Sequence, residues 1–238
     1  MTEIRAWRGK RVCDVLIALP AAMVLAPVIL FLALLVWIRT GDSGFYVHER
    51  MGYRGRRFGL IKLRTMRSGV AGPHVTCAGD ARITDIGRFL RRTKLDELPQ
   101  IWNVLRGDMS FVGPRPEAPQ FVDLNNRLWR EVLSVRPGIT DDVSLLLRDE
   151  EALLAKATSR DAYANIVLPE KLKLAAASVG MSSPWRDVVI ILRTLLAVFR
   201  GPPKNDFTIM VENKLTSVVI PAQAGTQCHY AGSPHARG

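Results

Sequence analysis

The uncharged run VLIALPAAMVLAPVILFLALLVWI, from Val15 to Ile38, decides how the rest of the chain is organised. As one straight helix, its 24 residues would extend about 36 Å at about 1.5 Å per residue. The hydrocarbon core of a bilayer is about 30 Å thick, so the run is long enough to cross it once. A cleavable signal peptide is disfavoured, because the run is long and the following WIRTGD offers no small-residue cleavage site.

Two prolines and two basic flanks complicate a simple crossing. Pro20 and Pro27 each remove a backbone donor and favour a kink. Because positive flanks stay on the cytoplasmic side, a helix that breaks at Pro27 and returns to the same face satisfies both flanks. An ordinary kinked span is the alternative, since prolines are tolerated in membrane helices. The flanking cations are Arg5, Arg8, Lys10 and Arg11 before the run, and Arg39, Arg50, Arg54, Arg56 and Arg57 after it.

Length, charge and cysteine content narrow the class of protein. The chain has 238 residues, enough for one compact domain or one domain with an appended segment. It is 48% hydrophobic yet carries a net charge of +11, so apolar and cationic residues gather in separate places. A strongly basic surface favours polyanionic partners: nucleic acid, anionic lipid headgroups or phosphate-bearing substrates. Cys13, Cys77 and Cys228 have no spacing that suits a zinc site or a disulfide framework, which favours a reducing, cytoplasmic-side location.

The segment after the apolar run, GFYVHERMGYRGRRFGLIKLRTM from Gly44 to Met66, predicts two short strands around a basic, glycine-rich turn. Apolar Ile61 and Leu63 alternate with Lys62 and Arg64, the period of a half-buried strand. Both cations therefore project from one face, where they either meet a ligand or form a solvated edge. The glycine- and proline-containing residues 68–81 predict a mobile loop.

Two helices are predicted next. One begins at about Thr84, and the second begins at Asp96 and ends at Gly107. Pro99 falls in the first turn of the second helix, where proline costs little. The positions that this helix is expected to bury are Ile101, Trp102 and Leu105.

The remainder is predicted to be helical with two irregular links. SFVGPRPEAPQF (residues 110–121) is a proline-rich connector, and VRPGIT (135–140) a tight turn. Helical patterns follow in SLLLRDEEALLAKA, PEKLKLAAASVG and WRDVVIILRTLLAVFR. The last has an apolar face with arginines outside it, which fits a helix on a membrane surface or a core helix. From about Gly201 the periodicity ends, and the tail is expected to be poorly ordered.

The stretch TKLDELPQIWNVLRGDMSFVGPRPE, from Thr93 to Glu117, places two adjacent acids, Asp96 and Glu97, at the start of a predicted helix. Aspartate before a helix is more often an N-cap than a nucleophile. The same placement suits phosphate chemistry, because a helix N-terminus attracts phosphate and a carboxylate can attack phosphorus or bind Mg²⁺. The cations available to neutralise phosphate charge are Lys62, Arg64, Arg91, Arg115 and Arg136.

Four pieces of the sequence, in order, resemble the monotopic bacterial sugar transferases, the phosphoglycosyl transferases that begin glycan assembly on a polyprenol carrier. These pieces are KRVCDVLIALP…APVI, FGLIKLRTM, GRFLRRTKLDELPQIWNVLRGDMSFVGPRPE and RPGIT. The resemblance extends from about Lys10 to Arg200, and the block from LDELPQ to VGPRP is long and specific.

The resemblance implies a fold and a location. We expect a mainly helical α+β fold in three parts: a basic N-terminus and re-entrant membrane helix broken at Pro27 over residues 1–40, a compact catalytic domain with a small β-hairpin over 41–200, and a disordered tail over 201–238. The helix would enter only the inner leaflet of the bacterial inner membrane. The catalytic domain would then lie on the cytoplasmic face, and a homodimer is among the assemblies that the sequence allows.

The resemblance also implies a reaction. Asp96 would attack the β-phosphate of a UDP-sugar, release UMP and hold the phosphosugar covalently, and a polyprenyl phosphate such as undecaprenyl phosphate would then accept it. Glu97 would assist as a base or metal neighbour, with Mg²⁺ required and held by Asp96 and Glu97. Lys62, Arg64, Arg91, Arg115 and Arg136 match basic positions of the family motifs. Glycan classes open to such a product include exopolysaccharide and other cell-surface polysaccharides or glycoconjugates.

The chain departs from the family pattern in two places. Ala26 stands before Pro27 where many members have serine, and DDVSLLLRDEE follows PGIT where many have a glycine-containing GxAQVNGR stretch. The second departure leaves the donor sugar open and keeps a catalytically degenerate member as one alternative. A non-catalytic basic module that binds anionic lipid or nucleic acid is another, but aromatic residues are not interleaved with the basic runs, which argues against nucleic acid.

Overall fold

The computed structural model describes residues 6–70, 76, 79–147, 150–155, 162–199 and 206–217. The α-helices are α1 (Lys10–Thr40), α2 (Asp85–Thr93), α3 (Ile101–Arg106), α4 (Arg127–Val132), α5 (Asp142–Leu146), α6 (Glu150–Ala155), α7 (Leu168–Val179), α8 (Pro184–Phe199) and α9 (Asp206–Ser217). The strands are β1 (Phe45–Met51), β2 (Arg57–Leu63), β3 (Ser110–Val112) and β4 (Gly138–Thr140). Short turns of other helix types are η1 (Tyr53–Gly55), η2 (Leu95–Gln100), η3 (Pro119–Phe121) and η4 (Tyr163–Val167). The fold is mainly helical with small sheets, as the sequence predicted.

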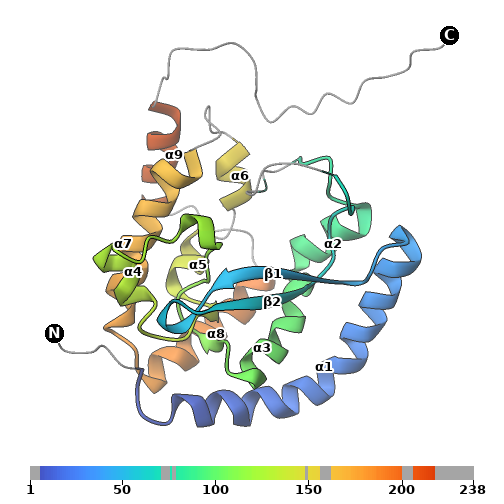
Figure 1. Ribbon diagram of the computed structural model, residues 1–238, viewed down its shortest axis with the longest axis horizontal. Coiled ribbons are helices and arrows are strands. Elements are labelled where there is room, and N and C mark those ends of the chain that lie inside the picture. The colour runs from blue at the N-terminus through green and yellow to red at the C-terminus, as the bar shows by residue number, and fades with distance from the viewer. Residues whose placement is uncertain are drawn as a thin grey trace.

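Helix α1 contains the whole uncharged run and both prolines, and its ribbon curves around one side of the molecule (Figure 1). By length and composition it could cross a membrane, and only 28% of its most apolar window is buried in the protein. The buried positions lie on one stripe that packs against the rest of the chain: Asp14, Ala18, Ala22, Ile29, Leu32, Ala33 and Val36. Most of the other apolar side chains of α1 are exposed, an arrangement typical of a membrane-contacting surface.

The predicted hairpin is confirmed: β1 and β2 pair antiparallel, with Phe45 opposite Leu63 and Met51 opposite Arg57. It lies centrally, between the α1–α3 side and the α4–α7 side of the molecule (Figure 1). Asn103 of α3 is fully buried and bonds to the β2 backbone, accepting from Ile61 N (3.0 Å) and donating to Gly59 O (2.7 Å). These two bonds fix α3, and the acids that precede it, against β2.

Two hydrophobic cores lie on either side of the hairpin. One combines the inner stripe of α1 with residues of β2, α2 and α3, and the other joins α4, α5, α6, α7, η4 and α9. Glycine is required at two positions where backbone segments approach too closely for a Cβ atom. A side chain at Gly87 would meet Thr65 O at 2.0 Å, and one at Gly138 would meet Gly113 N at 2.1 Å.

Several predicted links and boundaries are corrected. The connector and the tight turn each contain a strand, because β3 and β4 pair in parallel, with Ser110 opposite Gly138. The predicted helix from Asp96 to Gly107 is instead η2 followed by α3, and Trp102 is 43% exposed rather than buried. The expectation of a poorly ordered tail is wrong for 206–217, since α9 buries Val211 and Leu215 in the second core. Half of the loop at 68–81 (residues 71–75, 77 and 78) and the tail after Ser217 lie outside the described residues.

Helix α8 exposes most of the apolar face that the sequence identified. Its exposed large side chains are Trp185, Val188, Leu192, Leu195 and Leu196, whereas Ile190 is buried. Arg186 does not face solvent freely but pairs with Asp142 of α5 (2.5 Å). The exposed face favours the membrane-surface interpretation of this helix over the core interpretation.

Candidate active site

The acid pair lies at a sharp change of direction between α2 and η2. Lys94 follows α2 in the left-handed conformation (φ 59°), and its N–H bonds to the last carbonyls of α2, at Leu90 and Arg91. Left-handed backbone is costly for a residue other than glycine and is often found beside functional sites. Asp96 therefore falls inside η2 and makes no capping bond, so the N-cap interpretation of Asp96 is wrong.

Asp96 is a buried carboxylate with spare bonding capacity. Asp96 is only 5% exposed, and its carboxylate oxygen Oδ1 has no hydrogen-bond partner in the protein. Burial raises the pKa of Asp96 above its usual value; Lys62 opposes this rise, Glu97 adds to it, and Arg91 and Lys94 oppose it. A buried acceptor without a partner is costly, which makes this oxygen a candidate for contact with a ligand.

Both carboxylate oxygens of Glu97, in contrast, accept hydrogen bonds from cationic side chains. Arg115 donates to both of its oxygens (Nη2–Oε1 2.5 Å, Nη1–Oε2 3.2 Å), and Lys62 Nζ lies 3.2 Å from Oε1. Burial alone would raise the pKa of Glu97, but Arg115 and Lys62 outweigh it and hold the pKa well below the usual range. Such a carboxylate is a weak general base at neutral pH, so its geometry suits the positioning of Arg115 and Lys62.

A cleft of about 1770 Å³ opens over this pair, at the seam between the two cores. Of the predicted phosphate ligands, Lys62, Arg64, Arg91 and Arg115 all line it. Arg91 donates to Thr65 Oγ1 (3.2 Å). Arg64 instead turns along the strand edge and donates to Ser43 O (2.8 Å) and Phe45 O (3.3 Å). Lys62, Arg91 and Arg115 are thus the predicted cations that the structure brings to the acids.

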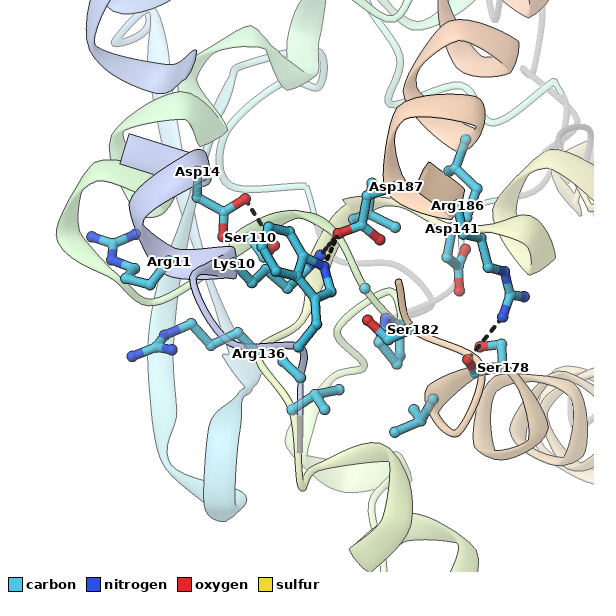
Figure 2. A pocket seen from close by; sticks show the side chains of 18 of the residues that line it. Lys10, Arg11, Asp14, Ser110, Arg136, Asp141, Ser178, Ser182, Arg186 and Asp187 are labelled. Atoms are coloured by element: carbon cyan, nitrogen blue, oxygen red, sulfur yellow. Dashed lines mark hydrogen bonds and ion pairs between the residues drawn. The ribbon is translucent and has the colours of Figure 1, made fainter. Parts of the chain in front are cut away.

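Arg136 lies elsewhere, in a second and smaller cavity of about 240 Å³ (Figure 2). Its Nε donates to Gly107 O (2.8 Å), and Arg11 donates to Val104 O (2.5 Å) and Leu105 O (2.8 Å). Both arginines therefore bind carbonyls at the C-terminal end of α3, where cations are favourable. The structure does not bring Arg136 to the acid pair.

A family model, bacterial sugar transferase, matches residues 5–201. The chain belongs to the bacterial sugar transferase family. This match covers the long apolar helix α1, the hairpin and the acid pair, and it confirms the resemblance inferred from the sequence motifs.

Several curated relatives of this sugar transferase are named as sugar-phosphate transferases or exopolysaccharide production proteins. The UDP-glucose:undecaprenyl-phosphate glucose-1-phosphate transferase of Caulobacter vibrioides is 36% identical over 193 residues, covering 78% of this chain and 68% of the relative. The exopolysaccharide production protein ExoY of Rhizobium meliloti is 36% identical over 209 residues, covering 80% of this chain and 85% of the relative.

A third relative is matched over a smaller share of its own length. The UDP-N-acetylgalactosamine-undecaprenyl-phosphate N-acetylgalactosaminephosphotransferase of Aeromonas hydrophila is 32% identical over 199 residues, covering 81% of this chain. This chain spans only 44% of that relative's length. The share of each relative that the match covers therefore ranges from 44% to 85% among these three.

The sequence interpretation missed a second charged cluster in the cleft of this sugar transferase. Lys171 Nζ lies 2.9 Å from Glu117 Oε1, 3.0 Å from Glu150 Oε2 and 3.1 Å from the Tyr163 hydroxyl. Despite burial, Glu117 and Glu150 hold the pKa of Lys171 well above its usual value. Glu117 ends the quoted family block, but Lys171, Tyr163 and Glu150 come from α7, η4 and α6, and no local spacing in the sequence reveals that meeting.

The residues present fit a Mg²⁺ ion at Asp96 better than at Glu97. The unpartnered Oδ1 of Asp96 is the kind of hard oxygen donor that Mg²⁺ takes, alongside substrate phosphates. Both oxygens of Glu97 already accept from cations. Within the described part of the chain, no group of three or more His, Cys, Asp or Glu side chains could hold a metal. A metal here would therefore rely on the substrate for most of its ligands.

Proposed function

We propose that the chain transfers a phosphosugar from a UDP-sugar to a polyprenyl phosphate such as undecaprenyl phosphate and so initiates cell-surface polysaccharide or glycoconjugate synthesis. The observation that carries the proposal is the carboxylate of Asp96, buried with a spare oxygen in a cation-lined cleft. Its place inside the LDELP motif of a sugar transferase and the names of the relatives support the same reaction.

The reaction takes two displacements at one phosphorus. In the first, Asp96 Oδ1 bonds to the β-phosphorus of the donor while the bond from that phosphorus to the bridging oxygen breaks, so UMP leaves with the electron pair. In the second, an oxygen of the polyprenyl phosphate bonds to the same phosphorus and the bond to Asp96 breaks. The Asp96 carboxylate is then restored, and the product is a polyprenyl-diphospho-sugar.

The cations around the acids stabilise the phosphate charge. Glu97 orients Arg115 and Lys62, and these two cations, together with Arg91 near the end of α2, direct positive charge to the cleft beside Asp96. Mg²⁺, held by Asp96 and by the phosphates of the donor, would supply further charge neutralisation for the leaving UMP. Glu97 acts in this scheme as a positioning residue.

The membrane part of the proposal rests on α1. We place its exposed apolar surface in the inner leaflet of the bacterial inner membrane, with a break at Pro27 that returns the chain to the cytoplasmic face. Leu25 of α1 lines the cleft, which gives a polyprenyl chain a path from the membrane to Asp96. Labelling of Cys13, which is exposed near the start of α1, tests the topology. With Cys77 and Cys228 replaced by serine, a membrane-impermeant maleimide should not label intact spheroplasts; labelling there would indicate a spanning helix.

The test of the reaction is nucleotide release. Purified, detergent-solubilised protein is incubated with Mg²⁺, undecaprenyl phosphate and each member of a panel of UDP-sugars, and UMP and UDP are measured separately. We expect UMP from at least one donor, and loss of at least about 10³-fold in the Asp96→Asn variant. The matched control is Asp123→Asn, an exposed aspartate that does not line the cleft.

The other outcomes each point to a different function. Release of UDP would mean direct glycosyl transfer and would overturn the proposed mechanism. Saturable binding of a UDP-sugar with no UMP from any donor would indicate a degenerate family member. Equal UMP release by wild type and Asp96→Asn would remove Asp96 from the chemistry.

A further inference from the structure

The wall of the cleft formed by β1 carries an aromatic pair that the proposed chemistry does not use. Tyr46, His48 and Arg50 alternate along β1 and share the face that lines the cleft. The rings of Tyr46 and His48 lie 5.9 Å apart between centroids, tilted by 43°. Tyr46 is 45% exposed and belongs to neither hydrophobic core. An exposed aromatic surface inside a charged cleft is available to a flat ligand.

The pair begins next to the reacting centre. Tyr46 is directly opposite Lys62 across the hairpin, and directly opposed residues have Cβ atoms about 4.5–5.5 Å apart. Lys62 in turn contacts Glu97 at 3.2 Å. A ligand whose phosphate is held at Lys62 can therefore place its adjoining group against Tyr46 and extend it along β1 toward His48.

Arg64 fixes the ring of Tyr46. Its guanidinium lies 5.7 Å from the ring centroid and is tied down by bonds to Ser43 O and Phe45 O. A cation over one face of a tyrosine is favourable and limits rotation of the ring. The arginine that the sequence suggested as a phosphate ligand thus supports an aromatic platform in the structure.

We propose that the Tyr46–His48 pair, supported by Arg64, is the subsite for the nucleobase of the donor. The inference rests on the proposed use of a UDP-sugar. A nucleobase has a flat π face, and proteins commonly bind unpaired bases by stacking them on aromatic side chains. The other regions of the cleft suit the other parts of the reactants: Leu25 lies on the side of α1, and the Lys171 cluster offers hydrogen-bonding groups for hydroxyls.

The test compares ligands that differ only by the base. Inhibition of UMP release by UMP is measured against inhibition by ribose 5-phosphate, which has the same phosphate and sugar without uracil. Tyr46→Leu should weaken UMP about tenfold, leave ribose 5-phosphate unchanged, and raise KM for the donor with little change in kcat. Tyr46→Phe should retain most of the UMP affinity, because the ring is kept, and His48→Leu should show a smaller loss than Tyr46→Leu.

Tyr53→Leu is the matched control. Tyr53 also has arginine guanidinium groups near its ring, Arg54 at 5.0 Å and Arg136 at 5.5 Å, but it does not line the cleft. Its replacement should leave UMP inhibition unchanged, and thermal unfolding of each variant checks that it is folded.

Two results would overturn the inference while the proposed reaction stands. One is unchanged UMP inhibition in Tyr46→Leu. The other is an equal loss for UMP and ribose 5-phosphate, which would place the ribose or phosphate, rather than the base, at Tyr46. If instead wild type releases no UMP from any donor but binds UMP in a Tyr46-dependent manner, as seen by calorimetry, the proposed reaction fails and the nucleobase subsite stands.

Discussion

The large cleft and the small cavity differ in the balance between the cations and the acids that line them. Among the described residues, the large cleft is lined by eleven lysines and arginines but only five acids, and Asp96 Oδ1 within it has no partner. The small cavity at the start of α1 is lined, among the described residues, by four cations and four aspartates. There, Asp187 pairs with Lys10, Asp142 pairs with Arg186, and Asp14 accepts from Ser110 Oγ (3.0 Å).

This difference distinguishes a binding surface, the cleft, from a structural contact. We call the charged residues that line the small cavity the joint, because they connect the start of α1 to the rest of the fold. Buried charges that satisfy one another hold elements together, and the small cavity joins the start of α1 to β3, α5 and α8. A surplus of cations around an unsatisfied carboxylate costs stability unless an anionic ligand compensates it. We therefore expect substitutions in the cleft to change activity more than stability, and those in the joint to do the reverse.

After Asp96 itself, the largest effect is expected at Arg115, whose guanidinium donates to both carboxylate oxygens of Glu97. Arg115→Met should lower kcat/KM for UMP release by about 10²- to 10³-fold, because a charge-assisted contact to the reacting phosphate and the orientation of Glu97 are both lost. Arg115→Lys should recover only part of the loss, since lysine keeps the charge without the fork.

The control for Arg115 is Arg127→Met, which removes an arginine that is 78% exposed and pairs with Glu131 on the surface. This variant should keep full activity, because surface pairs contribute little. If Arg115→Met and Arg127→Met behave alike, the cation surplus in the cleft is not used for the reaction.

The second effect is on stability and belongs to the joint. Asp187 accepts from Trp7 Nε1 (2.9 Å) and pairs with Lys10, both charged side chains being only 12% exposed. Asp187→Ala should lower the free energy of unfolding by about 3 kcal/mol, because it leaves Lys10 buried without a counter-charge. Thermal unfolding in detergent measures the loss, and UMP release per folded molecule should not change.

A double variant tests whether the stability lost in Asp187→Ala comes from the unpaired charge of Lys10. Lys10→Met together with Asp187→Leu removes both charges, so it should recover part of the stability lost in Asp187→Ala. A double variant that is as unstable as the single one would mean that Asp187 stabilises the joint through Trp7 rather than through Lys10.

The sequence predicted the cleft better than the joint. The hairpin follows from the alternation of apolar and basic residues over 61–64 beside a glycine-rich turn. The sequence also named Lys62 as a cation for the same site as the acid pair, although not its contact with Glu97. The joint depends on contacts between residues about 180 positions apart, such as Trp7 and Asp187, for which local patterns carry no signal. Arg136 was grouped with the phosphate ligands for this reason: only the folded chain shows that it binds the end of α3.

The boundaries that were predicted wrongly share a physical cause. The parallel pairing of β3 with β4 joins two short, proline-flanked segments whose stability comes from each other rather than from their own periodicity. Helix α9 similarly becomes ordered by burying Val211 and Leu215 against η4 and its neighbours. Tertiary contacts outweigh weak local propensity in both places.

The smallest effect is a pH dependence that links stability and activity at Asp96. Burial raises the folded-state pKa of Asp96 above the value expected in the unfolded chain, so at neutral pH its ionised form opposes folding. As pH falls through the raised pKa, the folded protein takes up a proton before the unfolded chain does. Relative to Asp96→Asn, wild type should therefore gain stability on acidification, by at most about 1.4 kcal/mol per unit of pKa difference.

The activity should move in the opposite direction over the same pH range, because a protonated Asp96 cannot attack phosphorus. Glu97 would not reproduce this window, since its pKa is held low by Arg115 and Lys62 and it stays ionised there. Chemical unfolding of wild type and Asp96→Asn is measured across a pH series, and UMP release by wild type is measured in parallel. Together they test whether stability rises and activity falls on acidification. Parallel stability curves for the two proteins would mean that burial of Asp96 imposes no cost, and the contrast between an uncompensated cleft and a compensated joint would lose its energetic basis.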